Sequence, residues 1–248
     1  MKKIFAANWK LNKTPEQSRE FIIQFKNETF KYADFFSKSE IILFPQAFSL
    51  EAVSSLCAGT AIGFGPQNIY CEKSGAFTGE NSAEVALELK SKFALVGHSE
   101  RREHFQEQDS LLNKKVKLLQ ALNVTSIFCF GETLKQREAN QTLAVCFSQL
   151  DLALAGCDKS QRLIVAYEPV WAIGTGKVAT LEQVQEVHQA VFDKLTATGF
   201  SHFQILYGGS VKPENAGSLL KIPHVDGFLI GGASLEVNSY LQICLAQG

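Results

Sequence analysis

Short apolar runs rich in β-branched and aromatic residues recur about every 30 residues along this chain of 248 residues. The runs are continuous rather than alternating, which is typical of strands that are buried on both faces of a parallel sheet. The segments between them have the periodicity of helices. Eight strands are therefore predicted, at residues 4–8, 40–44, 61–65, 93–97, 125–129, 163–167, 204–208 and 227–231.

Three of the intervening helices have a recognisable start. Thr14 is followed by proline at the first helical position and by glutamine at the third, and Thr133 and Thr180 each begin a similar capping box. In the helix after Thr180, one face is made by Leu181, Val184, Val187, His188, Val191 and Leu195.

Eight strands that alternate with about eight helices indicate an α/β fold. No linker or low-complexity tract interrupts the pattern, so residues 1–248 are predicted to form a single domain. A closed (β/α)8 barrel, with eight parallel strands surrounded by helices, needs about 250 residues, which fits this length. An open doubly wound sheet is less favoured because no G-x-G-x-x-G motif follows a strand.

The composition argues against several kinds of partner. The 24 basic and 25 acidic side chains leave no net field that would attract nucleic acid. The apolar run after Lys2 and Lys3 is shorter than the roughly 7 to 15 residues of a secretory signal, and no segment approaches the roughly 20 apolar residues of a membrane helix. Six cysteines without a C-x-x-C spacing indicate reduced thiols and a cytoplasmic protein.

Charged or titratable side chains follow three of the predicted strands. Lys10 comes after the first strand, His98 after the fourth and Glu168 after the sixth. Barrel enzymes carry their active sites where the strands end, so a cation, an imidazole and a carboxylate are predicted to meet at one mouth. Each of them taken alone is more commonly a surface or structural residue. No metal site is expected, because the chain has no H-x-x-x-H or H-E-x-x-H motif.

Glycine pairs follow the seventh and eighth strands. Residues 207–210 are Tyr-Gly-Gly-Ser, and residues 231–234 are Gly-Gly-Ala-Ser. Glycines let backbone amides approach a ligand closely, and the loops after the last two strands of a barrel often bind phosphate. A phosphate site is therefore predicted, and the alternative is a pair of tight turns without a ligand.

Seven motifs connect the chain to a known family. In chain order they are NWK (8–10), GAFTGE (75–80), GHSERR (97–102), CFGET (129–133), AYEPVWAIGTGK (166–177), YGGSV (207–211) and VDGFLIGGASL (225–235). Together they closely resemble triosephosphate isomerase, across essentially the whole chain. The resemblance implies an aldose-ketose isomerase that interconverts dihydroxyacetone phosphate and D-glyceraldehyde 3-phosphate through an enediol(ate), in glycolysis and gluconeogenesis. It also implies that no metal or organic cofactor is needed.

The resemblance implies roles for individual residues as well. Glu168 matches the family's proton-shuttling base, His98 its electrophile, Lys10 a cation near the substrate oxygens, and Asn8 a polar contact. The backbone amides that would hold the substrate phosphate are those of Gly174, Ser210, Gly231 and Gly232.

Three further residues have supporting positions. Glu100 pairs with Lys10 or joins a proton path, or else it makes an outward salt bridge to the arginines that follow it. Cys129 ends the fifth strand and is expected to pack behind Glu168 rather than to react as a thiol. Tyr207 ends the seventh strand, next to the predicted phosphate loop.

Two segments resemble moving or docking parts of the family. A lid after the sixth strand would exclude water around the base and protect the enediolate from losing phosphate. A glycine-bounded loop would insert Phe77 into a second subunit and bring Thr78 toward its pocket in a homodimer, although Phe77 could instead pack on its own subunit. The lid consists of the hinges Pro169, Val170, Trp171 and Lys177, Val178, Ala179, with the tip Ala172, Ile173, Gly174, Thr175, Gly176.

The chain also departs from the family pattern. Val191 and Phe192 stand where many members have isoleucine and arginine, so Asp226 is expected to lack a salt-bridge partner. Leu11 replaces the commoner methionine, which conserves volume.

Two other functions are possible on the same fold. One is an isomerase or lyase barrel for a larger phosphorylated sugar, which the short glycine-bounded lid disfavours. The other is a non-catalytic binding barrel, which the presence of Lys10, His98 and Glu168 disfavours.

Overall fold

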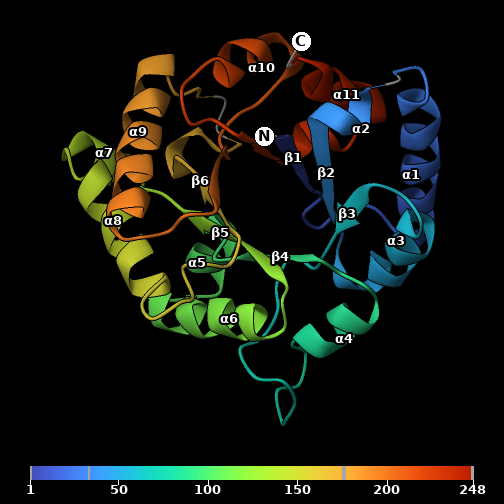
Figure 1. Ribbon diagram of the computed structural model, residues 1–248, viewed down its shortest axis with the longest axis horizontal. Helices are drawn as coiled ribbons and strands as arrows, with labels where there is room; N and C mark the ends of the chain where they lie inside the picture. Colours follow the sequence, from blue (N-terminus) through green and yellow to red (C-terminus); the bar gives the residue numbers. More distant parts are fainter. Residues whose placement is uncertain (1, 33, 175–176, 247–248) are drawn as a thin grey trace.

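The computed structural model describes residues 2–32, 34–174 and 177–246. Its strands pair in parallel and form a nearly closed barrel with helices on the outside (Figure 1). The neighbour order is β3-β2-β1-β8-β7-β6-β5-β4. The predicted (β/α)8 barrel is confirmed, and each predicted strand lies within one residue of an observed one at either end. The strands are β1 (Lys3–Asn8), β2 (Ser39–Phe44), β3 (Ile62–Phe64), β4 (Phe93–Val96), β5 (Thr125–Phe130), β6 (Leu163–Tyr167), β7 (Phe203–Tyr207) and β8 (Gly227–Ile230).

The helices begin where the capping motifs predict. At Thr14, Thr133 and Thr180 the threonine oxygen accepts a bond from the backbone of the third helical residue, and that glutamine bonds back to the cap. The α-helices are α1 (Pro15–Thr29), α2 (Phe35–Lys38), α3 (Leu50–Cys57), α4 (Ala83–Glu88), α5 (Ser99–His104), α6 (Asp109–Ala121), α7 (Leu134–Glu138), α8 (Thr142–Ala153), α9 (Leu181–Ala197), α10 (Pro213–Leu220) and α11 (Val237–Leu245). Short 3-10 turns are η1 (Ala47–Ser49), η2 (Val170–Ala172) and η3 (Gly232–Ser234).

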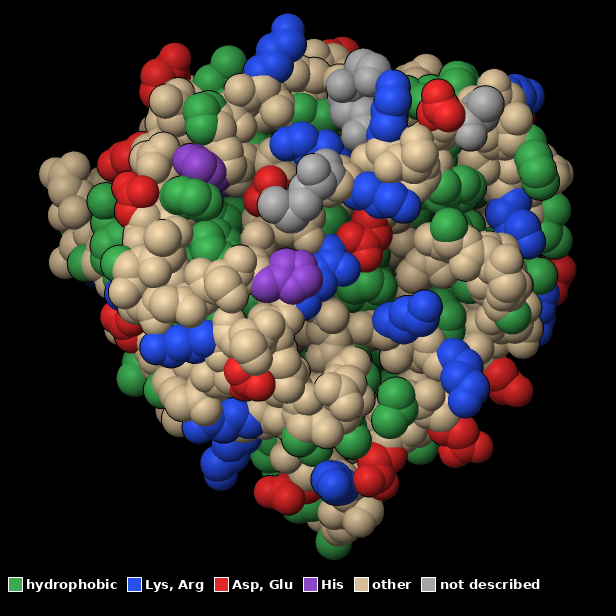
Figure 2. Space-filling view, viewed as in Figure 1, with side chains coloured by type: hydrophobic (Ala, Val, Ile, Leu, Met, Phe, Trp, Pro, Cys, Tyr) green, Lys and Arg blue, Asp and Glu red, His purple; other side chains and the backbone are tan. Residues whose placement is uncertain are grey.

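The surface charges and the helices bear on whether the chain has a charged binding face or a membrane-spanning segment. Figure 2 shows positive and negative side chains interspersed over the face seen in Figure 1. Across the three described ranges, no helix is both long and apolar enough to cross a membrane.

The barrel closes between β3 and β4. The Lys92 amide donates to the Phe64 carbonyl across this seam, at 3.3 Å. The backbones can approach because Gly65 has no side chain: a Cβ there would lie 1.7 Å from the Phe93 carbonyl oxygen. The seam therefore depends on this glycine.

A polar network lies at the amino-terminal end of the barrel interior. The Arg162 guanidinium donates to both carboxylate oxygens of Glu40, at 2.9 and 2.6 Å, and to Gln204 Oε1 at 2.5 Å. These three residues lie at the starts of β6, β2 and β7. The apolar inner core of the strands comprises Ile4, Ala6, Ile42, Phe44, Phe93, Leu95, Ile127, Cys129, Ile164, Ala166, Leu206 and Leu229.

Helix α9 buries most of the face picked out by its periodicity. Five of the six residues on that face are buried, and Leu181, the first residue of the helix, is 43% exposed. Periodicity shows which residues share a face but not how deeply each of them is buried.

The departure at Phe192 is accommodated by an aromatic stack. Its ring lies 3.8 Å from that of His224, centroid to centroid, with the planes 18° apart. Within the described part of the chain Asp226 makes no ion pair, as predicted, and its carboxylate accepts a bond from the Ile205 amide at 3.0 Å. Phe192 thus packs on His224, and Asp226 binds the backbone of β7.

Candidate active site

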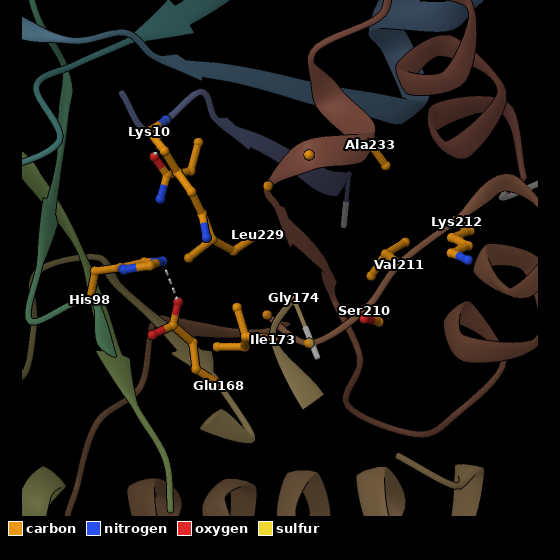
Figure 3. A pocket seen from close by; sticks show the side chains of 15 residues that line it. Lys10, His98, Glu168, Ile173, Gly174, Ser210, Val211, Lys212, Leu229 and Ala233 are labelled. Carbon is orange, nitrogen blue, oxygen red and sulfur yellow. Dashed lines mark hydrogen bonds and ion pairs between the residues drawn. The ribbon is translucent and has the colours of Figure 1, made fainter. Parts of the chain in front are cut away.

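A pocket of about 240 Å³ opens at the carboxyl ends of the strands. Figure 3 shows Lys10, His98 and Glu168 on one side of it and Ser210 on the other. The structure brings together the residues for which catalytic or substrate-binding roles are predicted, and those roles stay predictions. The pocket is lined by Asn8, Lys10, His98, Glu168, Ile173, Gly174, Gly208, Gly209, Ser210, Val211, Lys212, Leu229, Gly231, Gly232 and Ala233.

Glu168 is held after β6 by contacts to both of its carboxylate oxygens. Oε1 lies 3.0 Å from His98 Nε2, and Oε2 accepts a bond from the Ser99 amide at 2.9 Å. The residue is only 2% exposed. Gly208 leaves room for it, since a Cβ there would lie 2.9 Å from Glu168 Cγ. Donors on both oxygens offset the cost of burying this charge.

His98 is the N-cap of α5, and this position sets its protonation. Its Nδ1 accepts a hydrogen bond from the Glu100 amide at 3.3 Å. An accepting ring nitrogen carries no proton, so the geometry assigns the proton to Nε2 and makes the imidazole neutral. His98 can therefore donate a hydrogen bond into the pocket without itself carrying charge.

Lys10 is fixed in an unusual backbone conformation just after β1. Its φ of 51° is uncommon for a residue with a side chain. The Lys10 amide donates to Asn8 Oδ1 at 3.1 Å, and the Lys10 carbonyl accepts from Gln67 Nε2 at 2.8 Å. Asn8 and Gln67 thus hold the turn that aims the lysine at the pocket.

Glu100 pairs with Lys10, which is one of the alternatives left open for it. Its Oε1 lies 2.5 Å from Lys10 Nζ. Burial alone would raise the pKa of Glu100, but the hydrogen bond from Lys10 and the positive charges around the carboxylate, that of Lys10 among them, outweigh burial and lower that pKa below its ordinary value. Glu100 therefore lies beside the lysine as an ionised partner, and its supporting role stays a prediction.

The loops after β7 and β8 form the other side of the pocket. A Cβ on Gly231 would lie 3.2 Å from Lys10 Cε, so the lysine stem lies directly against this loop. Gly231 precedes η3, and Gly232 begins it. Lys212, which the sequence analysis did not select, also lines this side. Two glycine-containing loops and a cation therefore line this side of the pocket, where phosphate binding is predicted.

The lid segment borders the pocket. Ile173 and Gly174 line it, and the Ser210 hydroxyl donates to the Ala172 carbonyl at 3.0 Å. The φ of Gly174, 67°, is a conformation that favours glycine. The predicted tip residues Thr175 and Gly176 lie outside the described residues.

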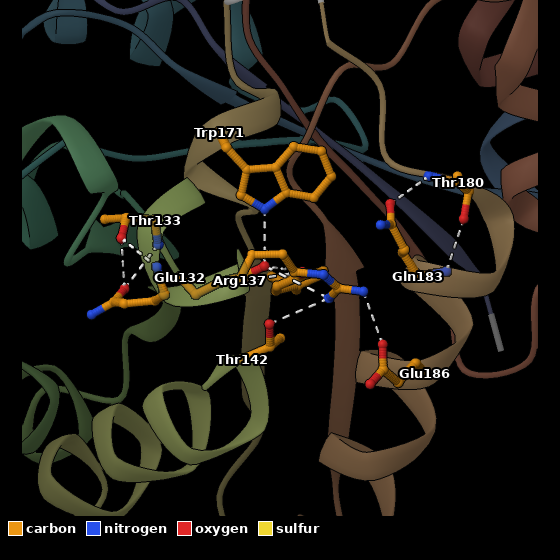
Figure 4. A network of polar contacts seen from close by, with 10 residues as sticks. Glu132, Thr133, Arg137, Thr142, Trp171, Thr180, Gln183 and Glu186 are labelled. Atoms are coloured by element: carbon orange, nitrogen blue, oxygen red, sulfur yellow. Dashed lines mark hydrogen bonds and ion pairs between the residues drawn. The ribbon is translucent and has the colours of Figure 1, made fainter. Parts of the chain in front are cut away.

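Glu132 holds the first hinge of the lid (Figure 4). Trp171 Nε1 donates to Glu132 Oε1 at 2.9 Å, and the Tyr167 hydroxyl donates to the same carboxylate at 3.1 Å. The Val170 amide donates to the Glu132 carbonyl at 3.1 Å. Arg137 lies 3.8 Å away. Pro169, before this hinge, is buried, whereas in the second hinge Lys177 and Val178 are exposed and Ala179 is buried.

Two of the supporting residues are buried behind the pocket. Burial raises the pKa of the Cys129 thiol well above its ordinary value, and the charge of Glu168 adds to this, so Cys129 is a packing residue. Tyr207 is also fully buried, and burial raises the pKa of its phenol. Its hydroxyl has no hydrogen-bond partner among the residues that the structure describes. Its supporting role stays a prediction.

The loop between β3 and α4 projects from the barrel (Figure 1). The Phe77 ring lies 4.3 Å from that of Tyr70, centroid to centroid, yet Phe77 remains 40% exposed. Thr78 is exposed. Phe77 thus packs partly on its own chain and still presents apolar surface.

Besides Lys212, sequence reasoning missed Ser99 and Glu132. Ser99 contributes a backbone amide, which any residue type could supply, so no side-chain signal marks it. Glu132 comes two residues after the end of β5, behind Gly131, and is fully buried. A carboxylate close to the end of an apolar strand is the kind of signal that selected Glu168, and it could have selected Glu132 too.

The fold and the pocket together define a (β/α)8 barrel with a candidate active site at the carboxyl ends of its strands. Among the residues that the structure describes, no group of three or more His, Cys, Asp or Glu side chains is placed to hold a metal ion.

Comparison with known proteins identifies the family. The family described as Triosephosphate isomerase matches residues 3–247. The chain is 55% identical to triosephosphate isomerase of Bdellovibrio bacteriovorus over 243 residues, which cover 98% of this chain and 99% of that one. Identity is 44% over 249 residues with the enzyme of Clostridium acetobutylicum (97% of each chain) and 39% over 247 residues with that of Aquifex aeolicus (98% of each chain). This chain belongs to the triosephosphate isomerase family.

Proposed function

We propose that this protein interconverts dihydroxyacetone phosphate and D-glyceraldehyde 3-phosphate, in glycolysis and gluconeogenesis. The observation that carries the proposal is the pairing of Glu168 with His98 at 3.0 Å in a buried pocket that Lys10 also lines. The name that the relatives share supports the same reaction.

Glu168 acts as the base. A hydrogen on the carbon beside a carbonyl is weakly acidic, and its removal leaves an electron pair that delocalises onto the carbonyl oxygen as an enediolate. The proton moves to the Glu168 carboxylate and is returned to the neighbouring carbon. A second proton passes from the oxygen that becomes the aldehyde carbonyl to the oxygen that becomes the hydroxyl, so ketone becomes aldehyde with no net change in atoms or electrons. The burial of Glu168 supports this role, because a poorly hydrated carboxylate is a better proton acceptor.

His98 and Lys10 stabilise the oxygen on which charge develops. The neutral imidazole donates its Nε2 hydrogen, and the lysine adds a positive charge. A positioned donor of this kind contributes on the order of 10²- to 10³-fold to turnover. Asn8 fixes the turn that carries Lys10 and offers a polar contact to the substrate.

The backbone amides of the glycine-rich loops hold the phosphate. They are those of Gly231 and Gly232 at the start of η3, with Ser210 and, from the lid, Gly174. A pocket of about 240 Å³ supports a three-carbon substrate rather than a larger sugar.

The lid excludes water during the reaction. Ile173 lines the pocket beside Glu168, and water kept from the enediolate cannot assist loss of phosphate. Deleting residues 172–176 should raise the release of inorganic phosphate relative to isomerisation. Unchanged partitioning between the two products would contradict a protective lid.

A homodimer is the proposed assembly. Three large apolar side chains are exposed on the loops after the neighbouring strands β1, β2 and β3: Leu11 at 90%, Phe48 at 89% and Phe77 at 40%. Such a surface favours burial against a second copy, with Thr78 reaching its pocket. Light scattering should give a dimer mass for the protein and a monomer mass for Phe77→Asp, and a monomeric unsubstituted protein would contradict the proposal.

We also propose that residues 1–248 form one domain and that the protein is located in the cytoplasm. All six cysteines are free, and five of them are buried, which fits a reducing compartment.

A coupled isomerase assay on the purified protein, run in both directions with larger phosphorylated sugars as controls, tests the proposed reaction. Turnover of the triose phosphates is expected. Turnover of another sugar phosphate in its place would contradict the assignment.

A further inference from the structure

The end of β4 has an unusual backbone at the residue before His98. Regular pairing of β4 with β5 stops at Val96, opposite Phe128. Gly97 then adopts a φ of 75°, which turns the chain out of the strand. A Cβ on Gly97 would lie 2.8 Å from a Leu112 methyl group, so only glycine fits this turn.

The turn leaves the carbonyls of Gly97 and Cys129 without a hydrogen-bond donor from the neighbouring strand. Carbonyls of successive strand residues point to opposite neighbours. The Phe130 carbonyl accepts from the Glu168 amide on the β6 side, so the carbonyl of Cys129 points toward β4. There the ladder has already ended, and the carbonyl of Gly97 is likewise beyond it.

The Arg102 guanidinium binds both of these carbonyls. Nε donates to the Gly97 carbonyl at 2.8 Å, and one terminal nitrogen donates to the Cys129 carbonyl at 3.1 Å. The other terminal nitrogen bonds Asp109 Oδ1 at 2.7 Å, which orients the group. Arg102 therefore continues the junction of β4 and β5 with side-chain donors where backbone donors are missing.

We propose that Arg102 is a positioning residue for catalysis, which sets the distance between His98 and Glu168 by clamping the ends of β4 and β5. The Arg102 amide also donates to the His98 carbonyl at 3.2 Å, so its backbone and its side chain hold both sides of the peptide that carries the imidazole. On the β5 side it holds Cys129, which packs behind Glu168. The inference rests on the proposed isomerase function.

A planar fork with several donors is required for this clamp. Lysine carries the same charge but places its donors on one nitrogen, so it cannot reproduce the two carbonyl bonds and the ion pair together. Arg101, the residue before Arg102 in α5, provides the matched control. Its side chain binds Glu107 at 2.8 Å, away from the strand ends.

The test compares Arg102→Lys with Arg101→Lys in the coupled assay. A misplacement of about 1 Å can lower turnover on the order of 100-fold, so kcat of Arg102→Lys should fall by up to that factor. The KM and the inhibition constant of inorganic phosphate should change little, because the Arg102 side chain binds Gly97, Cys129 and Asp109, which lie outside the glycine loops. Arg101→Lys should keep its kcat. An unchanged kcat in Arg102→Lys, or equal losses in both variants, would overturn the proposal.

Two further readouts separate positioning from stability and from the function itself. Guanidinium chloride at low concentration should partly restore kcat to Arg102→Ala, whereas sodium chloride should not, and an absence of rescue would count against the clamp. The imidazole NMR signals of His98, assigned with His98→Ala, should shift in Arg102→Lys but not in Arg101→Lys. This shift tests the clamp even if the unsubstituted protein does not turn over triose phosphates, a result that would refute only the proposed function.

Discussion

The two ends of the barrel both carry charged groups in its interior, but they use them differently. At the amino-terminal end Arg162 binds both Glu40 and Gln204, and among the buried side-chain atoms described for these three residues only Arg162 Nε has no hydrogen-bond partner. At the carboxyl end Glu168 and His98 also bind one another, yet they do so at the wall of a pocket. A substrate oxygen can therefore take the place of either partner.

This difference assigns stability to one end and chemistry to the other. Separating Glu40 from Arg162 would leave a partly buried charge without its partner. Separating Glu168 from His98 leaves a base and a donor, each still held by a backbone amide of α5. Substitutions at the two ends should consequently affect different measurements.

Removing the imidazole should produce a large loss of activity. In His98→Ala, kcat should fall on the order of 10²- to 10³-fold, because the donor to the developing oxyanion is lost. The coupled assay measures this. His104→Ala, at the exposed end of the same helix, is the control, and an equal fall in that variant would show that the loss is not specific to the pocket.

A buried histidine behind the pocket should make stability depend on pH. His188 packs against the rings of Tyr167 and Tyr207, and its Nδ1 lies 2.9 Å from the His224 carbonyl. Burial lowers the pKa of His188 from 6.5 to about 4. The unfolded chain takes up the proton first, so this stability is present above pH 6.5 and is lost as the pH falls toward 4.

The expected loss is roughly 3 kcal/mol once the pH is below 4, at about 1.4 kcal/mol for each pH unit between the two pKa values. The free energy of unfolding of the protein and of His188→Gln, measured from pH 7 to pH 4, isolates this contribution. Equal pH dependence in the two proteins would contradict the assignment.

Breaking the network at the amino-terminal end should lower stability and spare the activity. Arg162→Met leaves the Glu40 carboxylate without its main donors and should cost about 1 to 3 kcal/mol, nearer the lower value because both side chains are about a quarter exposed. Thermal unfolding measures the loss, and kcat should be unchanged. Adding Glu40→Leu to this variant should recover part of the stability. A fall in kcat without a fall in stability would contradict the assignment of stability to this end of the barrel.

The smallest effect is expected at the lid. Ser210→Ala removes the hydroxyl bond to the Ala172 carbonyl but keeps the backbone amide, so the change should be about 0.5 to 1.5 kcal/mol, or up to about tenfold in kcat/KM. Steady-state kinetics with each triose phosphate checks this. A loss as large as that of His98→Ala would mean that the side chain does more than hold the lid.

The strands and the residues after them could be predicted because burial on both faces leaves a direct mark on composition. Lys10, His98 and Glu168 interrupt or follow apolar runs, so their positions were visible in the sequence. The pairing of Glu100 with Lys10 was not, because three cations were possible partners and only the folded backbone selects one.

Other contributions leave no mark on the residue types. The Ser99 amide and the carbonyls of Gly97 and Cys129 belong to the backbone, and their roles follow from where the β4 ladder ends. Leu181 has the right period for a buried face, but its burial depends on what lies beneath the first turn of α9.

The most direct test of the account is the activity of Glu168→Gln. Glutamine keeps the shape of the side chain but cannot accept the substrate proton, so kcat should fall on the order of 10²- to 10⁴-fold while the melting temperature stays near that of the unsubstituted protein. Glu103→Gln, on the exposed part of α5, should keep full activity. A Glu168→Gln variant that turns over triose phosphates at nearly the original rate would contradict the claim that the chemistry resides at this end of the barrel.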